Sequence, residues 1–226
     1  MKIGMTLPVM EPNLTRKDLE NWTIRIDEGP WSHIALGERI LFHNPEFIST
    51  LSAVAAWTKR VEIIATISVL TMHNPILSAK QFATIDMISE GRFTLGVGVG
   101  GREEDYTAIG SNWSGRRWTI LSEKVKTMQS VWSRNYHPNL GPQLFSNSGP
   151  QILAGAVGPK AMEMSADFAD GLAGFSFNAD IEEINDSFSR VKDAFKKNNK
   201  SPRLVTSFWF GLGEYGRADI QTHLER

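Results

Sequence analysis

The sequence predicts an α/β fold in which helices cover a parallel sheet, of the (β/α) barrel type but short by the eighth β/α unit. Segments with strand and helix patterns alternate seven times along the chain, which is the order that a parallel sheet requires. Barrels of eight such units typically have about 250 residues, and this chain has 226. No repeat, low-complexity segment or linker divides it. A single, C-terminally short domain over residues 1–226 is therefore expected.

The strands are predicted from short runs of apolar and β-branched residues bounded by glycine, proline or charged residues. The richest run is residues 61–70, in which valine, isoleucine, alanine and threonine dominate. The same criterion gives the whole set: residues 2–8, 31–37, 61–70, 93–99, 151–156, 171–177 and 204–212. The residues from Gly216 onward are expected to begin a helix.

The helices are predicted from apolar residues that recur at intervals of three and four. The most regular spans residues 118–132, with Leu121, Val125 and Met128 on one face. Thr15 is a candidate N-cap, and Pro159 occupies a favoured place in a first turn. The predicted helices are residues 13–29, 47–58, 76–89, 118–132, 159–169 and 181–197. The stretches 101–117 and 134–150 show no period and are expected to be irregular.

Glycines mark the end of the strand at residues 93–99. Gly98, Gly100 and Gly101 lack a Cβ atom, which lets a flat ligand or another backbone approach closely, so this strand end resembles the floor of a site. The glycines from Gly96 to Gly101 also satisfy the dinucleotide-binding fingerprint G-x-G-x-x-G, but no helix starts at the third glycine and two β/α units precede it. The alternative that these glycines only relieve crowding in a barrel wall stays open.

Composition excludes several classes of function. The chain has 24 Lys plus Arg against 25 Asp plus Glu, so neither nucleic acid nor an anionic membrane is expected as a partner. The absence of cysteine excludes disulfides and thiolate catalysis, and the histidines lack the spacing of metal ligands, so no metal site is expected. Because the chain shows neither a leader-like N-terminus nor a long apolar run, a cytoplasmic protein is expected.

Several short motifs follow one another in a distinctive order. They are Gly37-Glu38-Arg39-Ile40, AKQFATID at 79–86, SEGR at 89–92, LGVGVGGREEDY at 95–106, Arg116-Arg117, Val131-Trp132, Gly155 with Gly158-Pro159, and Ala169-Asp170-Gly171. Together they resemble the luciferase-like flavin-dependent oxidoreductases (monooxygenases), more closely the branch that uses the deazaflavin F420. The resemblance covers nearly the whole chain. It implies a TIM-type barrel that holds F420 or FMN at the carboxyl ends of its strands.

The resemblance also implies which positions bind the cofactor. They lie at or just after the carboxyl ends of three strands: Thr66, Ile67 and Ser68; then Gly98, Gly100, Gly101, Arg102 and Glu104; then Gly155, Ala156, Val157 and Gly158. The first group would lie beside the ring, often at a non-prolyl cis peptide, and the glycines of the second along the ring and its polyol tail. The last group would bind the cofactor phosphate, which amides at a helix N-terminus favour in any case.

Three residues are candidates for catalysis. Glu38 and Arg39 follow the second strand, where barrels present catalytic groups, although an adjacent acid and base can also be an ordinary ion pair. His73 lies in the third loop, and a lone histidine is more often structural than catalytic. Many relatives have histidine where this chain has Arg39, so no histidine role is transferred to that position.

Two functions follow. The first is an oxidoreductase that transfers a hydride between F420 and a small organic substrate, or a monooxygenase that uses FMN. The alternative is a non-catalytic flavin-binding or partner subunit, which a shortened barrel would suit; a phosphosugar-binding barrel is a weaker third hypothesis. A homodimer is expected from the family alone. Gly100→Val is expected to abolish cofactor binding and to leave the fold intact.

Overall fold

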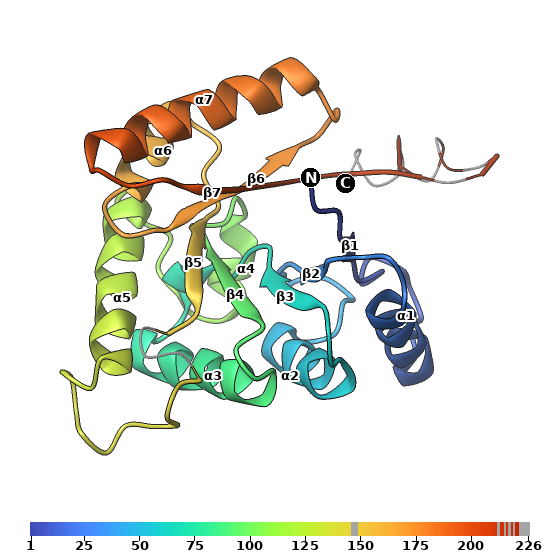
Figure 1. Cartoon of the computed structure of the whole chain (residues 1–226), viewed down its shortest axis with the longest axis horizontal. Helices are drawn as coiled ribbons and strands as arrows, with labels where there is room; N and C mark the ends of the chain where they lie inside the picture. Colours follow the sequence, from blue (N-terminus) through green and yellow to red (C-terminus); the bar gives the residue numbers. More distant parts are fainter. Residues whose placement is uncertain (146–148, 212, 215, 217, 219, 222–226) are drawn as a thin grey trace.

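The computed structural model describes residues 1–145, 149–211, 213, 214, 216, 218, 220 and 221. At its centre lies a curled parallel sheet of seven strands in chain order (Figure 1). The strands are β1 (Met5–Thr6), β2 (His33–Leu36), β3 (Glu62–Ala65), β4 (Phe93–Val97), β5 (Gln151–Ala154), β6 (Gly171–Ser176) and β7 (Arg203–Phe208). Every neighbouring pair is parallel. The predicted α/β fold with a parallel sheet is confirmed.

Helices alternate with the strands and cover the convex side of the sheet. They are α1 (Arg16–Glu28), α2 (Phe47–Trp57), α3 (Pro75–Ile88), α4 (Glu103–Ala108), α5 (Arg117–Trp132), α6 (Pro159–Ser165) and α7 (Ile181–Lys197), with a short 3-10 helix η1 (Leu70–Met72). In Figure 1, α1, α2, α3 and α5 follow the curve of β1 to β5, whereas α6 and α7 lie beside β6 and β7.

Local sequence explains where the helices begin. The side chain of Thr15 accepts a hydrogen bond from the Asp18 amide, and Asp18 in turn accepts one from the Thr15 amide, so the predicted N-cap is part of a capping box. Glu46, Asn74 and Asp180 cap α2, α3 and α7 in the same manner, each accepting from two amides of the first turn.

The structure differs from the predicted elements in several places. The stretch 101–117 was expected to be irregular, but it contains α4, whose first turn holds three acids that favour a helix N-terminus. The predicted strand 61–70 ends at Ala65, and the chain then turns through residues 66–69 into η1. The remaining strands are also shorter than predicted, because apolar runs continue past the last ladder hydrogen bond. The helix expected after Gly216 falls mainly outside the described residues.

Alternate residues of β3 face two different cores. Ile63 packs in the large core between the sheet and the helices, whereas Ile64 forms a small interior cluster with Leu153 and Ala173. A parallel strand buried on both faces requires this continuous apolar sequence. Glu62, one pleat below Ile64, belongs to a polar layer at the amino ends of the strands.

That polar layer is centred on Arg203 of β7. Its guanidinium donates to both carboxylate oxygens of Glu62, at 2.5 and 2.7 Å, and to the side chains of Gln151 (2.9 Å) and Thr94 (3.3 Å). Burial raises the pKa of Glu62, but the hydrogen bonds from Arg203 and Thr94 outweigh it and lower the pKa below its ordinary value. One side chain thus ties β7 to β3, β4 and β5 across the interior.

The sheet has two open edges. In the described part of the chain β1 pairs only with β2 and β7 only with β6, so the curl stops short of a closed barrel. This arrangement is consistent with the expected TIM-type barrel that lacks one unit. None of the described helices has the length and apolar character needed to cross a membrane.

Candidate functional site

The carboxyl ends of β2, β3, β4 and β5 lie at the same end of the sheet. Glu38 and Arg39 follow β2, residues 66–73 follow β3, and residues 98–108 follow β4. Because the strands are parallel, the loops that follow them lie together. Barrels carry their active sites at this end of the sheet. The structure therefore brings the three candidate catalytic residues to one end of the sheet.

Glu38 is the centre of a hydrogen-bonded network. Its Oε2 accepts from the Val69 amide at 2.6 Å and from the Ser68 hydroxyl at 3.1 Å, and its Oε1 lies 2.6 Å from Nε2 of His73. The Glu38 side chain is 4% exposed and the His73 side chain is 32% exposed. A carboxylate accepts hydrogen bonds only, so the proton between the two belongs to Nε2 of His73. The pair is a buried acid joined to a histidine that solvent reaches.

Arg39 has a different partner. Its Nε donates to Oδ2 of Asp105 at 3.1 Å, and Oδ1 of Asp105 accepts from the Leu41 amide at 2.8 Å. Asp105 is buried. Arg39 therefore joins the loop after β2 to α4, which follows β4, and it pairs with Asp105 rather than with the adjacent Glu38.

The charged run after β4 divides into an inner and an outer part. Arg102 and Glu104 are exposed and pair with each other at 3.6 Å, whereas Asp105 and Tyr106 point inward. Sequence analysis selected the two outer residues and missed the two inner ones. No pattern in the sequence separated the inner from the outer residues, because all four lie in one short polar stretch without an apolar period.

Three further side chains hold the turn that carries His73. Tyr106 pairs with the Thr71 hydroxyl and donates to the Val99 carbonyl at 2.6 Å, and Ser111 donates to the Met72 carbonyl at 2.7 Å. Lys124 of α5 donates to the Thr71 and His73 carbonyls at 2.7 and 2.5 Å. Sequence analysis missed all three. For Lys124 a signal existed, because it lies between Leu121 and Val125 on the apolar face of its helix.

The segment after β3 follows the path that the resemblance implied. The peptide bond between Thr66 and Ile67 is cis. The Ile67 carbonyl accepts from the Glu38 amide at 3.1 Å, and the Ser68 amide donates to the Gly96 carbonyl at 2.8 Å. These residues therefore connect the ends of β2 and β4.

The glycines of the site fall into two classes. A Cβ atom at Gly98 or Gly155 would meet the side chain of Ile67, and one at Gly100 would lie 2.8 Å from Cγ1 of Val69. A Cβ atom at Gly101 or Gly158 would meet no atom within 4 Å. The first class makes room for the protein itself, which is the crowding alternative, whereas the second class borders open space.

The backbone amides of the four residues after β5 differ in whether they already donate a hydrogen bond within the protein. The Gly155 amide donates to the Val97 carbonyl at 2.7 Å and the Ala156 amide to the Ala154 carbonyl at 3.1 Å. An anion at this loop would therefore find its donors at Val157, which is 70% exposed, and at Gly158. A cavity of about 20 Å³ lies beneath this loop, between β6 and α7.

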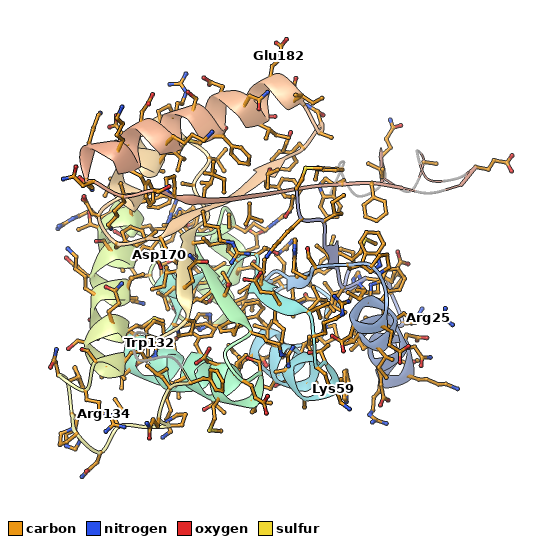
Figure 2. The ribbon with its side chains drawn as sticks, viewed as in Figure 1. Arg25, Lys59, Trp132, Arg134, Asp170 and Glu182 are labelled. Atoms are coloured by element: carbon orange, nitrogen blue, oxygen red, sulfur yellow. The ribbon has the colours of Figure 1, made fainter. Side chains whose placement is uncertain are left out.

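A larger cavity of about 320 Å³ lies away from this site. Trp132 and Arg134, labelled in Figure 2 at the end of α5, line it together with Lys80 of α3 and the loop at 140–144. Its lining residues include neither Glu38 nor His73, and no residue of the loops after β2 and β4. Among the described residues no group of His, Asp and Glu side chains has the arrangement of a metal site.

The chain is similar to known proteins in sequence and in fold. The sequence model of the family described as luciferase-like monooxygenase matches residues 23–214. The chain is 28% identical over 181 residues to 2,5-diketocamphane 1,2-monooxygenase 1 of Pseudomonas putida, which covers 75% of this chain and 47% of that protein. It is 37% identical over 94 residues to the pyrimidine monooxygenase RutA of Serratia proteamaculans, covering 40% of this chain and 25% of RutA.

Solved structures share the fold at lower identity. Monooxygenase RslO1 from Streptomyces bottropensis superposes with a TM-score of 0.78 at 21% identity, covering 100% of this chain and 76% of that one. An F420-dependent secondary alcohol dehydrogenase, solved with an F420-acetone adduct, gives 0.72 at 18% identity, covering 92% and 68%. The FMN complex of the oxygenating constituent of 3,6-diketocamphane monooxygenase from P. putida gives 0.74 at 15%, covering 90% and 64%. The chain thus spans about half or less of the curated relatives it matches.

Proposed function

Because the chain belongs to the luciferase-like monooxygenase family, we propose that it is an oxidoreductase that binds F420, or as second choice FMN, and acts on a small organic substrate. The family match supports this general chemistry. Solved structures that share the fold include one in complex with FMN and one described as F420-dependent, so the choice between the two cofactors rests on experiment. When bound, F420 would supply hydride transfer, and reduced FMN would supply activation of dioxygen.

The observation that carries the proposal is the contact between Glu38 and His73 at the carboxyl ends of the strands. Glu38 is buried and held by the Ser68 hydroxyl and the Val69 amide, so it fixes the proton of His73 on Nε2. The Nδ1 atom of a neutral ring in that tautomer is an acceptor. His73 can therefore take up a proton on Nδ1 and release it, while Glu38 stabilises the charged ring. Oxidation of an alcohol to a carbonyl compound, or its reverse, requires a proton transfer of this kind.

The residues around this pair would hold the cofactor. Thr66, Ile67 and Ser68 would lie beside the ring, and the open space over Gly101 leaves room for a ligand next to them. Gly98 and Gly100 would border it through their backbone, with Arg102 and Glu104 at the outer rim. The amides of residues 155–158 would receive the phosphate, with Val157 and Gly158 as its donors and Gly155 and Ala156 shaping the loop.

Arg39 has a role that follows from its partner. Its guanidinium neutralises the buried carboxylate of Asp105 and holds α4 against the loop after β2. We therefore propose that Arg39 shapes the site and that Glu38 and His73 handle the proton. Arg39 is a quarter exposed, so it can also meet a substrate at the rim.

Titration of the purified chain with F420 and with FMN, followed by fluorescence and calorimetry under identical conditions, tests the proposal. Selective binding of F420 would support hydride transfer and would direct a screen toward alcohols and carbonyl compounds. Selective binding of FMN would direct it toward oxygen-dependent chemistry. Binding without any turnover would favour the alternative of a non-catalytic partner subunit, and binding of neither would contradict the proposal for this chain.

A further inference from the structure

The carbonyl groups of the turn that ends in His73 all point to side chains from one later segment. Lys124 donates to the Thr71 and His73 carbonyls and lies 3.4 Å from that of Leu70, while Ser111 donates to the Met72 carbonyl. Four consecutive carbonyls, residues 70–73, therefore accept from two side chains that lie about 40 to 50 positions further along the chain. Leu70, Thr71 and Met72 are buried, so their carbonyls cannot be solvated and need donors from the protein.

The same turn supplies the groups that hold Glu38. The Val69 amide at its start and the His73 ring at its end both contact the carboxylate. A shift of the turn by less than an ångström would lengthen both hydrogen bonds beyond their useful range. The position of residues 69–73 thus determines whether the histidine and the acid meet.

Lys124 is an unusual residue to find in this place. It lies on α5 with its ammonium group half-buried, and burial lowers its pKa. No carboxylate in the described part of the chain forms an ion pair with it. A buried cation without a counter-ion is costly unless strong acceptors replace its hydration, and the Thr71 and His73 carbonyls do so here. A methionine would fill a similar volume but would leave the Thr71 and His73 carbonyls without this donor, so the ammonium group is the part of the side chain that holds the turn.

We propose that Lys124 is a positioning residue, which clamps the turn 70–73 through its carbonyls so that His73 and the Val69 amide meet Glu38. Only the expected effect of Lys124 on turnover rests on the proposed function. The clamp itself is a property of the folded chain and can be measured without cofactor or substrate.

Amide hydrogen exchange measures the clamp directly. In the Lys124→Met variant the Val69 amide should exchange about tenfold faster or more, because a charge-assisted hydrogen bond no longer closes the turn. The Ile152 amide, which donates to the Asp170 carboxylate at 2.8 Å, reports on opening of the whole sheet and should not change. Lys126→Met, an exposed substitution two residues away on the same helix, is the matched control and should change neither amide. Ser111→Ala removes one donor and should give a smaller acceleration at Val69.

A chemical rescue separates the ammonium group from the bulk of the side chain. The chain has no cysteine, so Lys124→Cys introduces a unique thiol. Alkylation of the unfolded variant with 2-bromoethylamine, followed by refolding, places an ammonium group near the original position. It should restore slow exchange at Val69, whereas alkylation with iodoacetamide should not.

The outcomes separate the two proposals. Equal acceleration at Val69 and Ile152, no acceleration at Val69, or failure of the aminoethyl rescue would overturn the clamp. With a cofactor that binds, Lys124→Met should lower kcat about tenfold while the cofactor Kd changes less than about threefold, since the loss is in the geometry of His73. Faster exchange at Val69 with unchanged kcat would support the clamp and count against the role of His73 in the proposed function.

Discussion

Glu38 shows how one buried carboxylate can organise a site. Its three partners, Ser68, Val69 and His73, all come from the segment after β3, so the acid of one β/α unit is bound by the loop of the next. Both oxygen atoms of the carboxylate thus have partners within the protein, and the contact with Oε1 fixes the tautomer of the ring. His73 thereby gains a defined proton position, which an exposed histidine on a loop would lack.

His73→Gln is expected to lower kcat by about 100-fold or more and to leave the Kd for the cofactor within a few-fold of the parent, because general acid-base catalysis is lost and binding is not. Steady-state kinetics and a fluorescence titration measure the two values. His43→Gln is the matched control, since His43 is exposed and contacts the Met10 carbonyl. Parent-like turnover in the His73 variant would remove it from the chemistry.

Gly100 and Gly101 are adjacent but serve different purposes. The backbone of Gly100 has φ of 63°, a region that favours glycine, and its missing Cβ makes room for Val69. The expectation that added bulk at Gly100 points toward a ligand is therefore corrected, because it would point into the protein. Gly101 is the position where a side chain would enter open space.

Gly101→Val should weaken cofactor binding at least tenfold with little change in the free energy of unfolding. Gly100→Val should instead lower that free energy by about 1–2 kcal/mol or more, because a β-branched residue is strained at positive φ and would also crowd Val69. Calorimetric titration and urea unfolding of both variants make the comparison. If Gly101→Val binds as tightly as the parent, the ligand does not lie over this turn.

At the scale of the elements, β7 is attached to the rest of the sheet in two ways. It forms a ladder with β6, and Arg203 at its start crosses the interior to Glu62 of β3, a residue 141 positions earlier. The guanidinium binds the carboxylate through two nitrogen atoms, which is a strong and directional arrangement. An edge strand is thus held by a polar contact where a closed barrel would have a second ladder.

Arg203→Met should lower the free energy of unfolding by about 1–3 kcal/mol, since it leaves the Glu62 carboxylate half-buried without its main donor. Arg190→Met is the matched control, because the pair of Arg190 with Asp186 lies on the exposed face of α7 and should contribute much less to the free energy of unfolding. Urea unfolding curves give both values. Equal effects of the two substitutions would mean that the interior layer does not stabilise β7.

At the scale of the whole molecule, the interior is arranged in layers along the strands. The polar layer of Arg203 and Glu62 lies at the amino ends, the apolar cluster of Ile64 and Leu153 follows, and Glu38 with His73 lies at the carboxyl ends. The two polar layers are separated by apolar side chains, so one can stabilise the fold while the other is free to bind and react.

The stability of the whole chain should depend on pH through Glu62. Its pKa is lowered in the folded state from an ordinary value of 4.5, so the folded form binds fewer protons than the unfolded form. The stabilisation is fully present above that value and is lost as the pH falls through the folded pKa. Glu62→Gln removes this contribution, and its free energy of unfolding should fall less steeply below pH 4.5 than that of the parent. Urea unfolding at a series of pH values measures this dependence. If the free energies of unfolding of the parent and the variant fall equally steeply with decreasing pH, the loss of stability in acid arises from other groups.

The sequence by itself determined the order and type of most elements and the end of the sheet at which the candidate residues lie. The apolar periods of α5 and β3, the cap at Thr15 and the boundaries at glycine are local, because each depends on residues within a few positions of one another. Local signals could not give the exact strand ends, and they missed α4, where charged residues concealed a short buried face formed by Asp105 and Tyr106.

Only the tertiary structure decided which of the candidates meet. It joined His73 to Glu38 and Arg39 to Asp105, assigned Gly98 and Gly100 to internal close contacts, and revealed Lys124 and Arg203 as residues that hold the site and the open sheet. These contacts join residues 31 to 141 positions apart in the chain. Their partners depend on how far the sheet curls and how each helix packs on it, and no short-range pattern of residues encodes those two quantities.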